Sequence, residues 1–194
     1  MQVASATLIT AGLAVGLAAL VLLHVLPTGL SPLRNAVSQY GISEYRVGYR
    51  VQTLAYAVAG VGAAIGVATL PGSVGIVVAL CAIFAVARAL ISWFPMDAPG
   101  ATRTRTGSRH GVLAIAAFLA AGFASRELVS LLNRDGIHPG IAAASGVLTL
   151  LMALSLIGIA LARRAHYFGV VERAFYVCMT AWLATVAVLV CLPR

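Results

Sequence analysis

Six long runs of apolar residues alternate with short polar segments along the chain. The runs cover residues 3–26, 51–70, 74–94, 110–132, 140–162 and 170–192. Each run is close to the length of about 20 residues with which an α-helix crosses the hydrocarbon core of a bilayer. The pattern predicts an all-α, polytopic integral membrane protein, in which six transmembrane helices form a single domain.

The longest polar interruption, residues 26–52, separates the first run from the second. The Ser-Pro pair at residues 31–32 is typical of a helix start, and Gly41 is typical of a helix end. Apolar residues recur between these signals with helical spacing: Leu33, Val37 and Tyr40. The polar residues of the opposite side are Arg34, Asn35 and Ser38. We expect a short interfacial helix here, which is either an ordinary connector or part of a binding site.

Pairs of small residues indicate where helices can pack closely. Gly12 and Gly16 in the first run, and Gly62 and Gly66 in the second, have the small-xxx-small spacing that lets helix backbones approach each other. A Leu-Pro-Gly-Ser turn at residues 70–73 joins the second run to the third. The second and third helices are therefore expected to lie antiparallel and side by side.

The composition favours a membrane protein over a soluble one. Of the 194 residues, 61% are hydrophobic and only 9% are charged, which is more apolar than a soluble domain of this size requires. The formal net charge is +8, and the arginines that provide it flank the apolar runs. We attribute this charge to membrane orientation and to anionic lipid head groups, and we expect no binding of nucleic acid.

The arginines are divided unevenly between the two ends of the predicted helices. Nine belong to one end: Arg34, Arg46, Arg50, Arg103, Arg105, Arg109, Arg163, Arg164 and Arg173. Three belong to the other: Arg126, Arg134 and Arg194. Because the more basic side of a membrane protein faces the cytoplasm, we expect a multi-pass protein of the plasma (inner) membrane with both termini outside the cytoplasm.

One further arginine, Arg88, lies inside the third run, six residues before Phe94. At a rise of 1.5 Å per residue it is about 9 Å from the end of the predicted helix. A lone charge at that depth is costly, so Arg88 is expected to have an internal partner or to line a wet cavity. We expect a carboxylate partner, Glu172 first and Asp97 second; the alternative is that Arg88 snorkels to the surface.

Two residues of the connector between the third and fourth runs are candidates for catalysis. Asp97 and His110 could form an Asp–His pair that orients a base, although the alternative is a loop-capping Asp and a separate helix-start His. His24 could join them as a third metal ligand, but nothing in the spacing requires it, and the three cysteines stand alone in apolar runs. We therefore expect no metal and no cofactor.

Four short motifs resemble those of the domain of unknown function 998 family. They are PLRNAVSQY at residues 32–40, FPMDAPG at 94–100, TGSRH at 106–110 and FGVVER at 168–173, in this order. The resemblance implies a six-helix bacterial or archaeal membrane protein and no particular activity. It also implies a set of motif residues: Arg34, Asn35, Ser38, Asp97, His110, Glu172 and Arg173.

Three classes of function are compatible with this sequence. The first is binding of an anionic membrane lipid or amphiphile in a polar cleft on the cytoplasmic side, with these ligand-binding candidates: Arg34, Asn35, Ser38, Arg88, Glu172 and Arg173. The second is a membrane-embedded hydrolase or transferase that acts on a lipid through Asp97 and His110. The third is a small-molecule or proton-coupled transporter. The sequence lacks H-E-x-x-H, G-x-S-x-G and P-loop motifs, and it predicts no oligomeric state.

Overall fold

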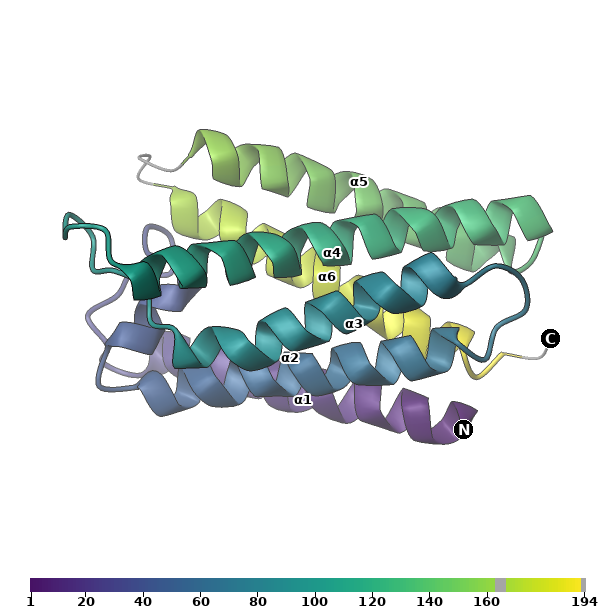
Figure 1. Cartoon of the computed structure of the whole chain (residues 1–194), viewed down its shortest axis with the longest axis horizontal. Helices are drawn as coiled ribbons and strands as arrows, with labels where there is room; N and C mark the ends of the chain where they lie inside the picture. Colours follow the sequence, from purple (N-terminus) through teal and green to yellow (C-terminus); the bar gives the residue numbers. More distant parts are fainter. Residues whose placement is uncertain (163–166, 193–194) are drawn as a thin grey trace.

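The computed structural model of the chain is a bundle of six long α-helices (Figure 1). It describes residues 1–162 and 167–192. The helices are α1 (Gln2–Val25), α2 (Arg46–Val67), α3 (Gly75–Leu90), α4 (Arg105–Asp135), α5 (Pro139–Leu161) and α6 (Phe168–Leu189). Two short 3-10 helices are η1 (Val37–Ile42) and η2 (Ile91–Trp93). All six long helices are apolar enough to cross a membrane, which confirms the predicted fold class.

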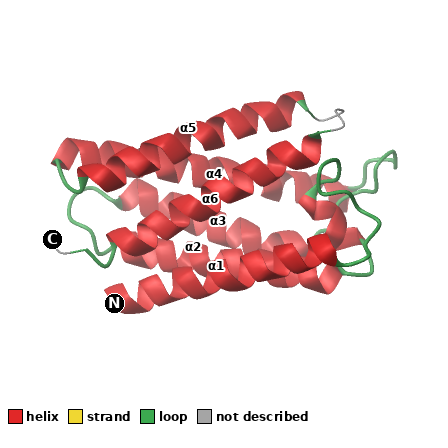
Figure 2. Cartoon of the chain, turned by 180° about the vertical axis from the view of Figure 1, so that it is seen from behind, coloured by secondary structure: helices red, strands yellow, loops and turns green. Residues whose placement is uncertain are grey.

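Successive helices run in opposite directions, so their connections alternate between two ends of the bundle (Figures 1 and 2). One end, which we call the connector end, holds the segments that follow α1, α3 and α5. The other, which we call the terminal end, holds the start of α1, the end of α6 and the turns that follow α2 and α4. The sharp turn between α2 and α3 is where it was predicted, with Gly72 at a φ of 87°.

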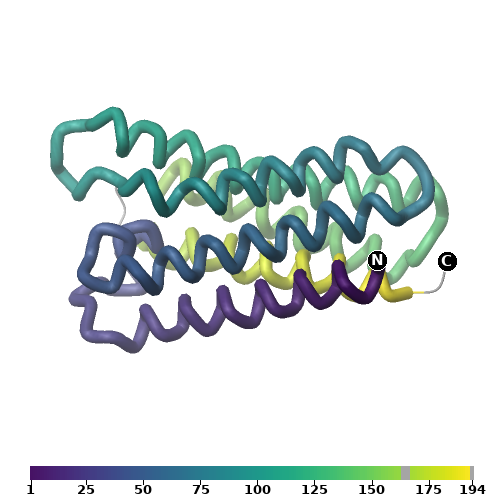
Figure 3. The backbone as a smooth tube through the Cα atoms, turned by 60° about the horizontal axis from the view of Figure 1, so that its bottom comes forward, coloured from purple at the N-terminus to yellow at the C-terminus, as the bar shows by residue number. Residues whose placement is uncertain are grey.

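The helices pack in chain order, and α6 returns to contact α1 and α2. Figure 3 shows α1 and α2 lying side by side along most of their length. Glycine makes this approach possible, because a methyl group added to Gly12 would lie 2.5 Å from the Ala55 carbonyl oxygen. A methyl group on Gly62 would lie 2.9 Å from the backbone nitrogen of Ile9. The predicted close packing of small residues is confirmed at this interface.

The outer faces of the six helices are apolar and exposed. Large hydrophobic side chains on these faces include Val21, Val58, Ile83, Phe123, Leu154 and Val177. A soluble protein rarely exposes so much contiguous apolar surface, whereas a bilayer provides an apolar environment for it. α2 and α6 are the most buried helices, and α5 is the least buried. The interior of the bundle therefore lies mainly between α2, α6 and the helices that flank them.

Two helices begin earlier than the apolar runs indicate. α2 begins at Arg46 and α4 at Arg105, because polar first turns continue these helices beyond the apolar segment. The cap of α4 is Thr104, whose hydroxyl accepts a hydrogen bond from the Gly107 amide at 3.0 Å. Ser108 lies inside the helix and donates to the Thr104 carbonyl oxygen.

The short helix predicted between α1 and α2 is present as η1, but it begins at Val37 and not at the predicted start near residue 32. Residues 31–35 form a turn, closed by the Asn35 side chain, which accepts from the Ser31 amide at 2.8 Å. Ala36 is extended, and only then does η1 begin. Val37 is buried as predicted, but Leu33 is 63% exposed. The backbone cannot continue as one helix because α6 uses its carbonyl groups: the Val170 amide donates to the Leu33 carbonyl at 3.2 Å.

Candidate functional site

A buried arginine lies inside the bundle, near its connector end. Arg88 of α3 is only 1% exposed. Its Nη1 donates to the Tyr176 hydroxyl of α6 at 2.9 Å, and its Nη2 donates to Oε1 of Gln52 of α2, also at 2.9 Å. Three helices therefore meet at one guanidinium group. The expectation that Arg88 points inward to a partner, rather than snorkelling to the surface, is confirmed.

Aromatic rings complete the surroundings of this guanidinium. The Arg88 Cζ atom lies 5.6 Å from the centre of the Tyr56 ring and 5.4 Å from that of Tyr176. Both distances are within the range of cation–π attraction, which is stronger away from water. The Tyr56 hydroxyl is 2.8 Å from the Thr180 hydroxyl, which fixes the ring against α6. We call the five residues Gln52, Tyr56, Arg88, Tyr176 and Thr180 the polar centre.

The prediction that Arg88 pairs with a carboxylate was wrong. Within the described residues the ion pairs are Arg126–Glu127 and Arg134–Asp135, and neither includes Arg88. Glu172 is one helical turn from Tyr176, but its Oε2 accepts from the Val37 amide at 2.7 Å. Neutral oxygen atoms thus solvate Arg88 through hydrogen bonds, while Glu172 acts on it only as a nearby charge. The positive charge of the polar centre is not cancelled by a direct ion pair.

Two buried donors of the polar centre have no partner with hydrogen-bond geometry in the described part of the protein, although the Gln52 amide lies near the Tyr176 hydroxyl. They are Nε of Arg88 and Nε2 of Gln52. A buried donor without an acceptor costs free energy, so such groups normally bind a water molecule or a ligand. Because one of these donors belongs to a cation, an anionic oxygen suits the site better than a neutral one.

A second set of contacts ties the α1–α2 segment to α6. Arg173 donates from Nε to Nε2 of His24 at 2.8 Å, and from Nη1 to the Asn35 carbonyl oxygen at 2.8 Å. Since an arginine can only donate, His24 accepts with a neutral ring nitrogen. The carboxylate of Glu172 holds the Val37 amide of η1. We call His24, Asn35, Val37, Glu172 and Arg173 the connector latch.

The remaining predicted residues of the α1–α2 segment do not form one polar face. Arg34 is exposed, and its side chain makes no hydrogen bond or ion pair with another described residue, although its backbone amide donates to the Ser31 carbonyl oxygen. Ser38 donates to the Met96 sulfur at 3.1 Å, and Asn35 donates from its amide to Gln39 at 2.6 Å. The three residues that were expected to share a helix face therefore have different surroundings.

Asp97 and His110 likewise have separate partners. The partly exposed Asp97 carboxylate accepts from the Thr104 hydroxyl at 2.6 Å and from the Thr104 amide at 3.1 Å. These bonds, the side-chain bond first, hold the pKa of Asp97 below its usual value. His110 is buried, and its Nδ1 donates to the Phe94 carbonyl oxygen at 2.8 Å. The arrangement matches the alternative in which Asp97 caps the loop and His110 anchors the helix start.

The structure brings together some of the predicted site residues and adds others. Asn35, Glu172 and Arg173 meet in the connector latch, and Arg88 lies one turn deeper. Sequence reasoning missed Gln52, Tyr56, Tyr176 and Thr180. A signal was present, because Gln52 and Tyr56 are four residues apart, as are Tyr176 and Thr180, so each pair shares one helix face.

No group of three metal-ligating side chains occurs among residues 1–162 and 167–192. Each of the three candidate ligands, His24, Asp97 and His110, uses at least one polar atom in the bonds described above. Arg163, Arg164 and Arg194, which contribute to the predicted charge asymmetry, lie outside the described residues.

No curated protein and no solved structure matches the chain. A family model described as "Protein of unknown function (DUF998)" matches residues 10–189. The match extends from α1 to the last residue of α6, so it includes the polar centre, the connector latch and all four sequence motifs. The chain therefore belongs to the DUF998 family, as the motifs predicted.

Proposed function

We propose that this multi-pass membrane protein binds an amphiphile with an anionic head group, and that Arg88 receives the head group. The proposal rests on the hydrogen bonds that the polar centre makes and on the donors that it leaves without an acceptor. A buried guanidinium has neutral hydrogen-bond partners, and two buried N–H donors, from Arg88 and Gln52, have no acceptor among the described residues. A phosphate or carboxylate oxygen would satisfy both donors and the charge.

The surroundings of the polar centre suit both the anionic head group and the apolar tail of such a ligand. Its donors come from α2 and α3, so one oxygen atom could bridge two helices. The Tyr56 and Tyr176 rings bring apolar surface next to the charge. Next to them the interior is packed with buried aromatic side chains, including Phe118 and Phe175, whose ring centres lie 4.5 Å apart. Apolar walls with a few convergent polar groups are typical of small-molecule sites.

The connector latch gives this site an entrance that can be closed. Val37 and Tyr40 of η1 are 0% exposed. Gly41, beside them, lies against the ring of Tyr49, one turn of α2 before Gln52. The α1–α2 segment thus covers the polar centre from the connector end. We propose that ligands enter when this segment moves, past three polar residues of the segment and two of α6: Arg34, Asn35, Ser38, Glu172 and Arg173.

The charge distribution favours entry from the cytoplasmic leaflet. The described arginines of the connector end are Arg34, Arg46, Arg50, Arg103, Arg105, Arg109 and Arg173. The terminal end has Arg126 and Arg134, and each of these is paired with an acidic neighbour. Positive residues at one end attract anionic head groups and orient the protein with that end inside.

The hydrolase or transferase alternative has less support than binding. It requires Asp97 and His110 to act together on a lipid, whereas each donates to or accepts from a different backbone or side-chain group. The polar centre also contains no hydroxyl next to a free base that would serve as a nucleophile. We therefore propose ligand binding as the function and assign no reaction.

Native mass spectrometry and thermal denaturation of the purified protein in detergent would test this proposal. The probes are dioleoyl phosphatidylglycerol, oleate and dioleoyl phosphatidylcholine, which compare a phosphate head, a carboxylate head and a head without net charge. We expect an anionic probe to raise Tm and bind more tightly than phosphatidylcholine. Gln52→Leu and Arg88→Gln should weaken that preference about tenfold or more, the loss expected for a charged hydrogen bond.

The matched control is Arg105→Gln, which removes an exposed arginine at the same end. It should leave the preference for the anionic probe unchanged. Equal binding of all three probes by the parent, or equal effects of Arg88→Gln and Arg105→Gln in folded protein, would show that the polar centre is a closed structural network.

A further inference from the structure

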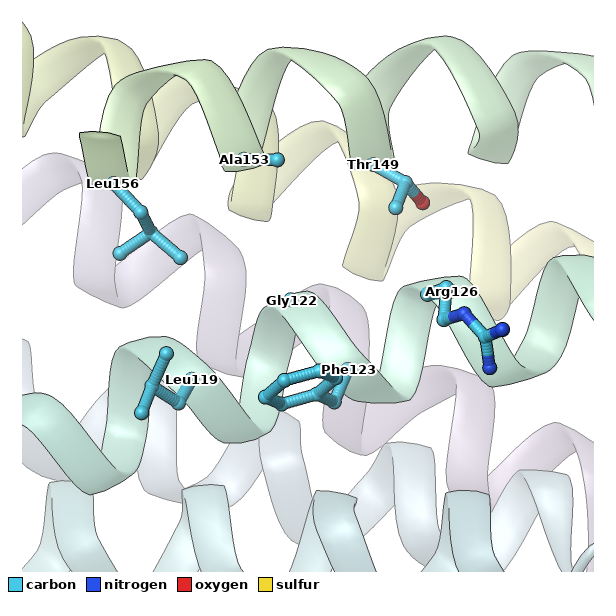
Figure 4. Close-up of a pocket in the computed structure, with 7 residues that line it drawn as sticks. All are labelled: Leu119, Gly122, Phe123, Arg126, Thr149, Ala153 and Leu156. Carbon is cyan, nitrogen blue, oxygen red and sulfur yellow. The ribbon is translucent and has the colours of Figure 1, made fainter. Parts of the chain in front are cut away.

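A groove on the membrane-facing side of the bundle lies between α4 and α5, away from the polar centre (Figure 4). It has a cavity volume of about 190 Å³. The lining residues are Leu119, Gly122, Phe123, Arg126, Thr149, Ala153 and Leu156. Leu119 and Phe123 are 42% and 54% exposed, so the groove opens toward lipid rather than into the core.

Small residues and a polar bridge together create this groove. Gly122 and Ala153 face each other with little bulk, and a methyl group added to Gly122 would meet only Leu156, at 3.7 Å. Beside them the Thr149 hydroxyl is 2.6 Å from the Ser125 hydroxyl and donates to the Ser145 carbonyl oxygen at 2.7 Å. The Ser125–Thr149 bond fixes the spacing of α4 and α5 at the Arg126 end of the groove, and the rest of the groove wall is apolar.

One charged residue stands at the end of the groove that is nearer the terminal end of the bundle. Arg126 lies nine residues before the last residue of α4, or about 13 Å at 1.5 Å per residue. With 31 residues α4 is about 46 Å long, roughly 16 Å longer than a hydrocarbon core of about 30 Å. In a centred helix Arg126 is therefore within about 5 Å of the head-group boundary, which its long side chain can reach.

The guanidinium of Arg126 has bonding capacity left for a ligand. Its side chain is 65% exposed. The bond to Glu127 uses Nη1, so Nε and Nη2 remain available to an oxygen of a phosphodiester. From this point the groove runs toward Leu156, deeper in the membrane. A phosphate at the boundary with an apolar channel beneath it is the geometry of one phospholipid acyl chain below its head group.

We infer that the α4–α5 groove is a second lipid site, which holds one acyl chain of a membrane phospholipid with its phosphate on Arg126. This site is independent of the proposed function, because it shares no residue with the polar centre and belongs to the opposite leaflet. Since Glu127 offsets the charge of Arg126, the site should accept phosphatidylglycerol and phosphatidylcholine similarly. That tolerance distinguishes it from the site at Arg88.

The experiment uses native mass spectrometry of the full chain released from nanodiscs of phosphatidylcholine or phosphatidylglycerol. It is done in the Arg88→Gln background, so that a lipid at the polar centre does not contribute. We expect one phospholipid to remain bound with either composition. Gly122→Phe, which fills the groove, should lower its retention about tenfold, the loss expected when one or two methylene groups leave an apolar site. Arg126→Gln should also weaken retention of the phospholipid.

The control is Gly111→Phe, because Gly111 lies on the same helix with open space around it. It should leave retention unchanged. If Gly122→Phe fails to fold, Ala153→Leu narrows the groove from α5 and should reduce retention in the same direction. Retention that is unaffected by filling the groove, or that Gly111→Phe lowers equally, would mean that only non-specific annular lipid is bound and would overturn the inference.

Discussion

At the scale of single residues, Arg88 is the side chain whose removal should destabilise the folded protein most. Arg88→Ala leaves the Gln52 amide oxygen and the Tyr176 hydroxyl without their buried donors. Each stranded group typically costs about 1–3 kcal/mol. We therefore expect a lower Tm in detergent than for Arg105→Ala, which removes an exposed arginine. Equal Tm values for the two variants would contradict a stabilising role for the polar centre.

Asp97 gives a prediction about pH. The Thr104 hydroxyl and amide stabilise its ionised form, so its pKa is lower in the folded protein than in the unfolded chain. Its contribution to stability is therefore complete above the unfolded pKa of about 3.9, and it is lost as the pH falls through the lower folded pKa.

Comparing Tm against pH for the parent and Asp97→Asn measures this contribution. The parent should be the more stable protein by a constant margin from pH 7 to pH 5, and the margin should shrink only under more acidic conditions. Thr104→Val is the complementary control, because it removes the hydroxyl donor and keeps the carboxylate. A margin that grows as the pH falls would have the wrong sign for a hydrogen-bonded carboxylate.

The sequence predicted which residue is unusual at this scale, but not what it contacts. Arg88 stands out because it is charged within an apolar run. Its partners Gln52 and Tyr176 are 36 and 88 positions away, and only the packing of three helices brings them together. A carboxylate was expected because a charge suggests a counter-charge. Neutral oxygens and aromatic rings also solvate a guanidinium, and no local pattern distinguishes these two solutions.

At the scale of helices and connectors, the six spans followed from apolar length alone. A short helix in the α1–α2 connector was also predicted, but its bounds were not, because they depend on α6. Local signals at residues 31–41 favour one helix, yet the backbone carbonyls of Leu33 and Asn35 accept from Val170 and Arg173 of α6. Long-range hydrogen bonds thus replace the local ones that a helix would need, and the connector becomes a turn followed by η1.

Gly169 should be the most sensitive position in this contact. A methyl group there would lie 2.4 Å from the Pro32 carbonyl oxygen and 2.8 Å from that of Asn35. Gly169→Ala must therefore push the connector away from α6, and we expect a loss of about 1–3 kcal/mol, the usual cost of overpacking. Hydrogen exchange of residues 31–42 should become faster, and Tm should fall.

Gly140→Ala is the matched control, because Gly140 is also the second residue of its helix and has open space around it. Alanine should be neutral or slightly stabilising there, since glycine lowers helix stability by roughly 0.5–1 kcal/mol. If Gly169→Ala were as stable as Gly140→Ala, with unchanged exchange in the connector, the close contact between α6 and the α1–α2 segment would be incorrect.

At the scale of the whole molecule, the arrangement separates two kinds of polar group. Most of the motif residues that the sequence singles out act between segments of the connector end: Asn35, Ser38, Asp97, His110, Glu172 and Arg173 all bind other parts of the chain. Among the buried donors without a partner are Nε of Arg88 and Nε2 of Gln52, which lie deeper, and Nη2 of Arg173 in the connector latch. Sequence position showed that these groups share one end, but the assignment of partners required the assembled bundle.

The orientation of the bundle in the membrane can be tested with a native cysteine. Cys191 is exposed at the terminal end, whereas Cys81 and Cys178 are buried within the bundle. Because the arginines favour a cytoplasmic connector end, we expect a membrane-impermeant maleimide to label Cys191 in intact cells. Arg103→Cys in a Cys191→Ser background should be labelled only after the cells are permeabilised, since residue 103 belongs to the α3–α4 connector. Labelling of Arg103→Cys in intact cells, together with protection of Cys191, would reverse the orientation and place the entrance to the polar centre in the outer leaflet.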